Sequence, residues 1–335
     1  MIIFRTDANP HIATGHLMRC LSIADECRQR GVPLCFVLAD SDSERLMKRL
    51  CPVGEEYRII VLESRYDAPT TEWPAFADVI TREKPRAILI DSYFVTADYL
   101  AKASQLARTF YLDDLKAFDY PVDTVIHYGV EARPDFSGEG KKAHYLSGPA
   151  YAPLRGQFAD VPYSVRAEVG DILITSGGSD EAGMCGRILA AVRATEATQT
   201  AVCHIVIGAL NRHRESLRQQ TADDPNIRLY EDFSEMASLM AQCDLAVSAA
   251  GSTIYELCAV GVPTVCFSAA ANQVPNAVGL SARKAVVYAV DGLFEAHIAA
   301  LAADLPRRRA LSARMRSLVD GRGAARIAEE LMEKT

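Results

Sequence analysis

The stretch SAAGSTIYELCAVGVPTVCF, residues 248–267, has the pattern of a strand, a helix and a second strand. An apolar run ends at Gly251, where Ser252 and Thr253 can begin a helix, and that helix stops at Gly261. Pro263 then opens a further apolar run of strand-forming residues. Apolar strands that alternate with helices are typical of a parallel sheet covered on both faces.

The same alternation extends over most of the chain in two series. Candidate strands lie at 2–4, 33–39, 57–62, 86–91, 109–114 and 124–128, and then at 171–178, 203–209, 227–233, 245–251, 263–269 and 285–290. Between the series, residues 130–168 lack periodicity and are rich in Gly, Pro and charge, and the last 30 residues have a helical pattern. The sequence therefore predicts an α/β protein with two Rossmann-like parallel-sheet domains facing a cleft, residues 1–150 and 151–335. Ligands of such sheets bind beyond the carboxyl ends of the strands.

Composition excludes several classes of protein. The chain has 335 residues, is 49% hydrophobic and carries a formal net charge of −7. Its one basic concentration, residues 306–316, is expected to be a solvated helix face, so we expect no nucleic-acid partner. Nine cysteines without a CxxC pair indicate reduced thiols in a cytoplasmic protein. Because no apolar run reaches about 18 residues and no leader pattern is present, we expect neither a membrane span nor a signal peptide, and we take the chain as a monomer.

Residues 5–24, RTDANPHIATGHLMRCLSIA, lead from the first strand into a helix that Thr14 can cap. The buried face of this helix is marked by Leu17, Leu21, Ala24 and Cys27. His16 lies in the first turn, where the helix dipole disfavours imidazolium and favours the neutral ring that a general base requires. The alternative is a histidine that only packs the loop against the neighbouring strand.

Charged residues follow three strands of the first series. Arg5 and Asp7 could bind a phosphate, carboxylate or hydroxyl of a ligand, or form an internal ion pair. Asp91 and the pair Asp113-Asp114 could bind a divalent cation or cap the helices that follow. Because no clear third ligand accompanies them, we favour capping and predict no metal site.

The segment TSGGSDEAG, residues 175–183, is a glycine-rich loop between a strand and a helix. Gly177 and Gly178 let backbone amides approach an anion at the helix end. The loop lacks both GxGxxG and the Walker Lys-Ser/Thr, so the sequence does not support dinucleotide binding or ATP hydrolysis.

The segment 248–267 offers a second anion site. Gly251, Ser252 and Thr253 present amides and hydroxyls to a phosphate at the start of their helix. Glu256, one turn further on, could accept hydrogen bonds from both hydroxyls of a ribose. The alternative for Glu256 is an ordinary surface position on the helix.

In this order, the motifs of the chain resemble the PseG family, the UDP-2,4-diacetamido-2,4,6-trideoxy-β-L-altropyranose hydrolases of the bacterial pseudaminic acid pathway. The motifs that carry the resemblance are RTDANPHIATGHLMRCLSIA (5–24), DSYFV (91–95), YLDDL (111–115), GPAYAPLR (148–155), ILITSGGSD (172–180) and SAAGSTIYELCAVGVPTVCFSAAANQ (248–273). More distantly, the chain is similar to MurG and other GT-B glycosyltransferases, which share a Gly-His loop and a Gly-Ser-Thr…Glu site for UDP. The resemblance implies a GT-B-like fold.

The resemblance also implies an activity, the hydrolysis of a UDP-linked 2,4-diacetamido-2,4,6-trideoxy sugar to free sugar and UDP. The C1–O bond would break with inversion, without a metal or another cofactor. His16 matches the base for the attacking water and Tyr93 a tyrosine of the family's site. The substrate-binding residues implied are Arg5, Asp7, Gly15, Asn272 and Gln273, and the UDP-binding residues are Gly177, Gly178, Gly251, Ser252, Thr253 and Glu256.

Physical reasoning agrees with this activity, because helix N-termini and hydroxyls can stabilise a departing UDP without a metal. Two alternatives stay open. A glycosyltransferase would pass the sugar to a lipid or glycan and would need an acceptor surface, although no amphipathic membrane helix like that expected for MurG is evident. A regulatory subunit would bind the UDP-sugar without turnover.

Overall fold

The computed structural model describes residues 1–9, 11–12, 14–51, 57–130, 143–208 and 211–333. The chain forms two compact units, one of residues 1–156 together with 322–335, and one of residues 157–321. The first boundary lies close to the expected one at 150/151. The end of the chain differs from the expectation, because residues 322–335 return to the first unit.

The sheet of unit 1 has the strand order β3-β2-β1-β4-β5-β6-β7, and all its pairs are parallel. Its strands are β1 Ile2–Thr6, β2 Leu34–Leu38, β3 Arg58–Val61, β4 Ala87–Asp91, β5 Thr109–Leu112, β6 Thr124–His127 and β7 His144–Ser147. The strand order reverses between β1 and β4, which are neighbours paired from Ile2 with Ala87 to Thr6 with Asp91. This is the doubly wound arrangement of Rossmann-like sheets.

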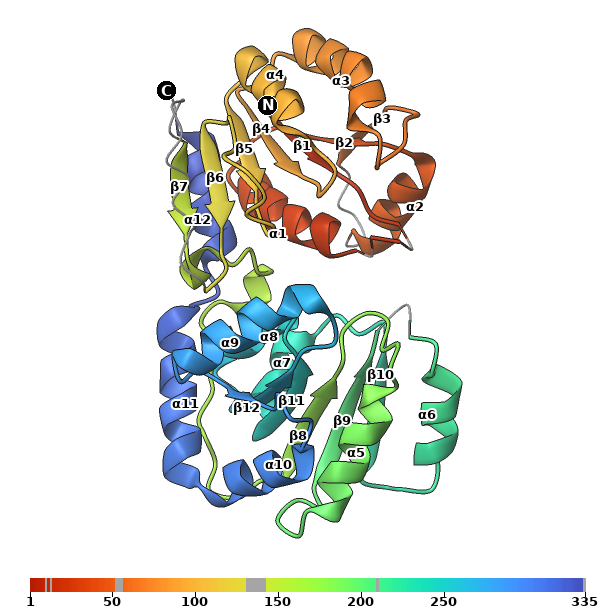
Figure 1. The fold of residues 1–335 in the computed structure, drawn as a ribbon, viewed down its shortest axis with the longest axis vertical. Coiled ribbons are helices and arrows are strands. Elements are labelled where there is room, and N and C mark those ends of the chain that lie inside the picture. Colours follow the sequence, from red (N-terminus) through yellow and green to blue (C-terminus); the bar gives the residue numbers. More distant parts are fainter. Residues whose placement is uncertain (10, 13, 52–56, 131–142, 209–210, 334–335) are drawn as a thin grey trace. The chain divides into compact units, whose positions relative to one another are not determined.

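Helices cover both faces of this sheet (Figure 1). They are α1 Gly15–Gln29, α2 Ser41–Leu50, α3 Pro69–Glu83, α4 Ala97–Leu106 and α12 Gly323–Met332, with a short 3-10 helix, η1, at Pro149–Tyr151. α3 and α4 pack on one face through Phe76, Val79, Tyr99 and Leu100. α1 lies on the other face and packs against α12, which brings the two ends of the sequence together.

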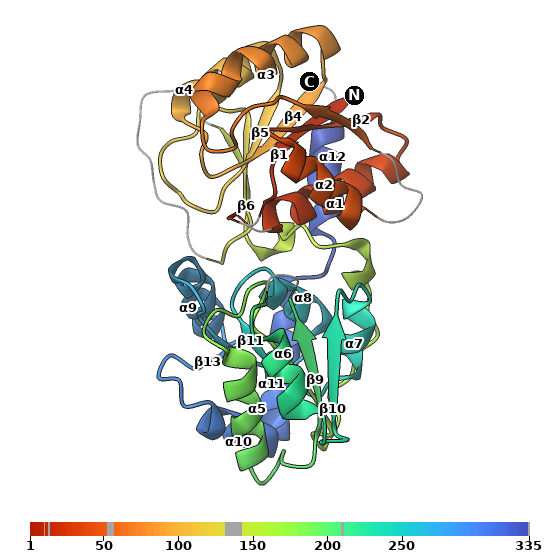
Figure 2. The same cartoon turned by 90° about the vertical axis from the view of Figure 1, so that its right-hand side faces the viewer.

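Unit 2 repeats this plan with the strand order β10-β9-β8-β11-β12-β13, again with parallel pairs (Figure 2). Its strands are β8 Asp171–Thr175, β9 Val202–Ile207, β10 Ile227–Glu231, β11 Leu245–Ala249, β12 Thr264–Phe267 and β13 Val287–Tyr288. Its helices are α5 Met184–Ala194, α6 Arg214–Thr221, α7 Met236–Gln242, α8 Thr253–Val260, α9 Val274–Ala282, α10 Phe294–Ala303 and α11 Leu305–Leu318, with the 3-10 turn η3 Ala271–Gln273. A further 3-10 turn, η2 Gly156–Phe158, spans the boundary between the two units in the sequence. The order reverses between β8 and β11, so both units carry the same kind of switch point.

The predicted strands are confirmed in both series, because continuous apolar runs form the buried centre of each sheet. Gly261 adopts a left-handed conformation, with φ of 90°, and ends α8 as expected. The structure adds β7, at the edge of the sheet within the expected break, where only Leu146 of the four residues is buried. Residues 131–142 of that break lie outside the described part of the chain.

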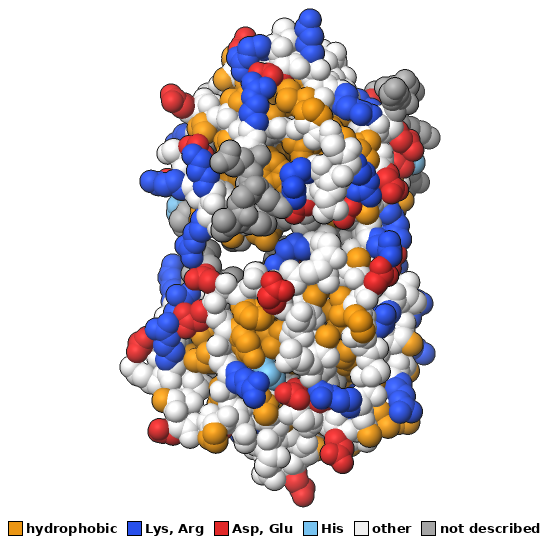
Figure 3. Space-filling view, turned by 180° about the vertical axis from the view of Figure 1, so that it is seen from behind, with side chains coloured by type: hydrophobic (Ala, Val, Ile, Leu, Met, Phe, Trp, Pro, Cys, Tyr) orange, Lys and Arg blue, Asp and Glu red, His pale blue; other side chains and the backbone are white. Residues whose placement is uncertain are grey.

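Side chains of both signs are interspersed over the face shown in Figure 3. In the described part of the chain, no helix has the length and apolar character needed to cross a membrane.

Candidate functional site

The switch point of unit 1 brings the loop after β1 beside the carboxyl end of β4. Ligands of doubly wound sheets bind at this place, because the loops on either side diverge there. α1 begins at Gly15, which is exposed and has open space around its Cα. Thr14 occupies the N-cap position, but its side chain makes no capping hydrogen bond, so the expected cap is wrong.

His16 lies in the first turn of α1, as expected, and is hydrogen-bonded to Asp91 at the end of β4. The Nδ1 atom is 2.6 Å from Asp91 Oδ1, and the His16 side chain is 6% exposed. Because an ionised carboxylate only accepts, Nδ1–H donates, and in the neutral ring the lone pair is then on Nε2. Among the described residues, none hydrogen-bonds Nε2, so this nitrogen is available to accept a proton from a ligand or water.

Asp91 is fully buried and is held by three side chains. Arg19 donates to both carboxylate oxygens, from Nε at 2.5 Å and from Nη2 at 2.6 Å, and Cys20 lies within 3.7 Å. Burial alone would raise the pKa of Asp91, but Arg19 and His16 outweigh it and hold that pKa well below its usual range. Asp91 therefore caps no helix, contrary to expectation; the cap of α4 is Thr96.

Tyr93 follows β4 and lies edge-on to His16, with ring centroids 4.3 Å apart. Its hydroxyl donates to Asp114 Oδ2 at 2.7 Å. Burial, together with the neighbouring Asp114 carboxylate, raises the pKa of Tyr93 well above its ordinary value, so the phenol stays protonated at neutral pH. The structure thus brings the two residues predicted as catalytic into contact.

Arg5 and Asp7 are placed as the internal ion pair that the sequence left open. Both are buried, and Arg5 Nη1 lies 2.6 Å from Asp7 Oδ2. Arg5 also donates from Nε to Glu72 at 2.8 Å, and Asp7 accepts from the Ala39 amide at 2.7 Å. Their charged atoms serve partners within unit 1, so we leave them outside the proposed site.

Asp113 and Asp114, which follow β5, have different roles. Asp113 is buried and accepts from the amides of Leu115 and Lys116 at 2.8 Å, which fixes the turn after the strand. Asp114 pairs with Arg19 Nη1 at 2.5 Å. Within the part of the chain that the structure describes, no group of three or more His, Cys, Asp or Glu side chains is placed to hold a metal ion.

In unit 2, the glycine-rich loop follows β8 at the second switch point. Gly177 has a left-handed φ of 85°, and Gly178 is exposed. A Cβ on Gly208, after β9, would lie 2.4 Å from the carbonyl oxygens of both glycines. The loop therefore packs directly against the backbone that follows β9, and Gly178 is its exposed residue.

The start of α8 lies on the other side of this switch point, after β11. Ser252 is the N-cap residue, exposed and without a side-chain capping bond. In the described structure, no acceptor is bound to the amides of Gly251, Ser252 or Thr253. The amides of Ser252 and Thr253 are among the donors left unpaired at the start of a helix. Glu256 is half-buried on the same helix. Unpaired amides at the start of a helix are suited to binding an anion.

The segment after β12 lies beside the start of α8. Gln273 is half-buried, accepts from the Ala269 amide at 2.9 Å, and its side-chain amide lies 3.5 Å from where a Cβ on Gly251 would be. Asn272 is exposed. Sequence reasoning missed Asn276, which donates to the Ala250 carbonyl at 3.3 Å and accepts from Tyr255 at 2.8 Å. No motif marked it, because the bonds depend on how α9 packs.

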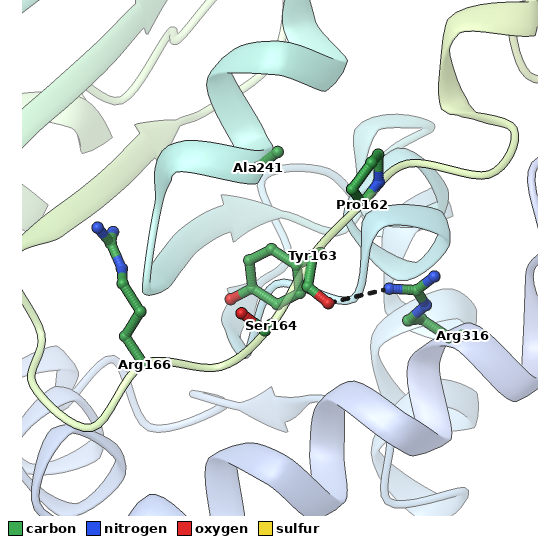
Figure 4. Close-up of a pocket in the computed structure, with 6 residues that line it drawn as sticks. All are labelled: Pro162, Tyr163, Ser164, Arg166, Ala241 and Arg316. Atoms are coloured by element: carbon green, nitrogen blue, oxygen red, sulfur yellow. Dashed lines mark hydrogen bonds between the residues drawn. The ribbon is translucent and has the colours of Figure 1, made fainter.

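A cavity of about 590 Å³ in unit 2 involves different residues (Figure 4). Arg166 is engaged by Asp244 and by Asp171, and Arg316 donates to the Tyr163 carbonyl at 3.4 Å. Neither a carboxylate nor an imidazole is among its described lining residues. The cavity offers no general base, and we assign it no part in the chemistry.

Comparison with known proteins gives a family match for the second half of the chain. Residues 172–330 match the model of the Glycosyltransferase family 28 C-terminal domain. The chain is similar to the spore coat polysaccharide biosynthesis protein SpsG of Bacillus subtilis, at 26% identity over 95% of this chain and 94% of that protein. It is also similar to the UDP-2,4-diacetamido-2,4,6-trideoxy-beta-L-altropyranose hydrolase of Campylobacter jejuni, at 24% identity over 76% of this chain and 86% of that protein.

Two further comparisons concern the length of a relative and the fold of a solved structure. An uncharacterized protein of Methanocaldococcus jannaschii, MJ1062, is 25% identical over 78% of this chain, and the match spans 54% of that relative's length. The crystal structure of MurG from Acinetobacter baumannii superposes with a TM-score of 0.72 at 14% identity, covering 99% of each chain. The chain therefore has the GT-B fold predicted from its sequence, with two parallel-sheet units.

Proposed function

We propose that the protein hydrolyses a UDP-linked 2,4-diacetamido-2,4,6-trideoxy sugar to the free sugar and UDP, with His16 as the general base. The observation that carries the proposal is the His16–Asp91 pair at the switch point of unit 1, with Nε2 free among the described residues. The printed name of the Campylobacter relative supports the choice of substrate.

In the proposed reaction, His16 Nε2 takes a proton from water as the water oxygen bonds to C1 of the sugar. The C1–O bond to the β-phosphate breaks on the opposite face, and its electron pair leaves with UDP. Asp91 accepts the hydrogen bond from Nδ1 and stabilises the imidazolium that forms. Attack opposite the leaving group inverts the anomeric centre.

In this proposal, unit 2 binds the UDP. The free amides at the start of α8 and the open edge of the 177–178 loop are suited to the diphosphate, whose negative charge grows as the bond breaks. Ser252 and Thr253 add hydroxyl donors, and Glu256 would accept from the ribose. Asn272 and Gln273 would face the sugar. None of these steps needs a metal ion.

A glycosyltransferase reaction is the second candidate. The match to the Glycosyltransferase family 28 C-terminal domain favours it, because the same UDP site can serve transfer to an acceptor hydroxyl. His16 would then deprotonate the acceptor in place of water.

The deciding experiment incubates the purified protein with the UDP-2,4-diacetamido-2,4,6-trideoxy sugar alone. UDP release is followed with time, and NMR identifies the first anomer of the free sugar. We expect release without an acceptor and with inversion. UDP release that requires an added acceptor would instead establish the transferase.

The base is tested with His16→Asn and a matched control, His11→Asn, in the exposed part of the same loop. We expect His16→Asn to lower kcat by about 10²-fold or more, the usual contribution of a general base, while His11→Asn stays near wild type. Near-normal turnover of His16→Asn would rule out the base role.

A further inference from the structure

Arg19 lies one helical turn after His16 at the centre of a cluster that the proposed reaction does not use directly. Its guanidinium binds both oxygens of Asp91 and, through Nη1, Asp114 at 2.5 Å and the Tyr128 hydroxyl at 2.9 Å. The Arg19 side chain is 10% exposed and Asp91 is 0% exposed. One side chain of α1 thus joins the ends of β4, β5 and β6.

The planar fork of arginine suits this task, because two parallel donors grip one carboxylate while a third reaches another. Asp91 in turn binds Nδ1 of His16, and Asp114 accepts from the Tyr93 hydroxyl. His16 and Tyr93, the two residues predicted as catalytic from the sequence, are therefore oriented by acidic groups that Arg19 holds.

The charges around the His16 ring also depend on Arg19. The titratable and charged groups of this cluster are Arg19 and Cys20 from α1, Asp91 and Tyr93 from the end of β4, Asp114 after β5 and Tyr128 after β6. Arg19 Nη2 lies 3.0 Å from His16 Nδ1. Without its charge, the Asp91 carboxylate beside the ring would lose its strongest compensating partner and would favour the protonated imidazole.

We propose that Arg19 is a positioning residue that fixes Asp91 against His16 and Asp114 against Tyr93, and whose positive charge beside the His16 ring opposes protonation of that ring. Its catalytic consequence rests on the proposed hydrolysis. Its effect on the titration of the His16 ring does not rest on that hydrolysis, because the titration can be measured without substrate.

The test compares Arg19→Met and Arg19→Lys with Arg28→Met, an exposed arginine on the same helix. The titration of the His16 ring is followed by NMR in each full-length, folded variant. For Arg19→Met we expect the midpoint to move to higher pH by about one unit or more, the size expected when a nearby charge is removed. Arg19→Lys, which keeps the charge, and Arg28→Met should titrate like the wild type.

The size of kcat and its pH dependence then separate the effect of the Arg19 charge from the effect of the Arg19 geometry. In Arg19→Met the acid limb of the kcat profile should move to higher pH, in step with the ring titration. In Arg19→Lys the limb should stay in place while kcat falls about 10-fold or more, because a point charge cannot hold two carboxylates. KM should change less than kcat in both variants.

The outcomes distinguish this inference from the proposed function. An unchanged ring titration in folded Arg19→Met would overturn the role of Arg19, whatever the activity. A wild-type protein that releases no UDP from the sugar would refute the proposed hydrolysis, while a shifted titration would still support the role of Arg19 in holding the ring.

Discussion

Asp91 shows how one buried carboxylate can be both a structural and a functional group. It accepts from Arg19 and His16 in a place where water does not reach, so its charge is compensated only by these partners. Removing one partner of a buried pair leaves the others uncompensated, which costs far more than the same change at the surface. Asp91 should therefore control the acid stability of unit 1.

We expect Asp91→Asn to lower the free energy of unfolding by about 3 kcal/mol at pH 7. The pKa of Asp91 is held below its unfolded value, so its contribution is fully present above about pH 4 and disappears as pH falls through the folded pKa. The wild type should thus lose stability more steeply below pH 4 than the variant. Urea unfolding across this range measures the difference.

The control for this prediction is Asp98→Asn, which removes an exposed carboxylate paired with Lys102 on α4. Its effect should stay within about 0.5 kcal/mol. Equal slopes for the wild type and Asp91→Asn below pH 4 would contradict the assignment.

At the scale of elements, the glycine-rich loop after β8 depends on a glycine that is distant in sequence. Gly208 follows β9 and permits contact with the backbone of Gly177 and Gly178. Since the neighbouring atoms are carbonyl oxygens rather than flexible side chains, a Cβ there could not be accommodated without moving the loop.

We expect Gly208→Ala to lower the melting temperature of unit 2. We also expect it to weaken UDP binding by about 10-fold or more, because the backbone amides of the displaced loop would no longer lie where they can donate to the diphosphate. Calorimetry measures both quantities. Gly178→Ala is the control for stability, because nothing lies within 4 Å of its Cβ position, and its melting temperature should be unchanged. Equal melting temperatures for the two variants would refute the packing argument.

At the scale of the whole molecule, α12 is the last helix of the chain but part of the first unit. It packs along α1, and Gly323 at its start lies against the backbone of Ala152, where a Cβ would be 2.1 Å from the carbonyl oxygen. The buried positions Ile327, Ala328 and Leu331 therefore complete the core of unit 1.

Two matched core substitutions test this division. Ile327→Ala in α12 and Ile298→Ala in α10 both truncate an isoleucine with 0% exposure, at an expected cost of about 3 kcal/mol each. Hydrogen exchange should show lost protection in unit 1, including α1, for the first variant, and in unit 2 for the second. Lost protection in unit 2 for Ile327→Ala would place α12 in the other unit.

A feature of this structure can be predicted from the sequence when it is determined by residues that are close together along the chain. The strands and the position of His16 follow from local patterns, because apolar runs and helix starts are encoded within a few residues. The partnership of His16, Arg19, Asp91 and Asp114 is not local: it depends on which strands become neighbours at the switch point. β7 escaped prediction because an edge strand with one buried residue carries little apolar signal.

The return of α12 to unit 1 has a consequence for synthesis of the chain. Unit 2 is in effect inserted into unit 1, whose sheet is complete by residue 147 but whose α1 waits for a helix that begins at residue 323. At ordinary translation rates this delay is about 10 to 35 s. During that interval the nascent chain exposes the side of α1 that α12 covers in the folded protein, and exposed apolar surface of this kind favours aggregation. The completion of unit 1 therefore depends on the synthesis of residues 323–332 and not only on the folding of its sheet.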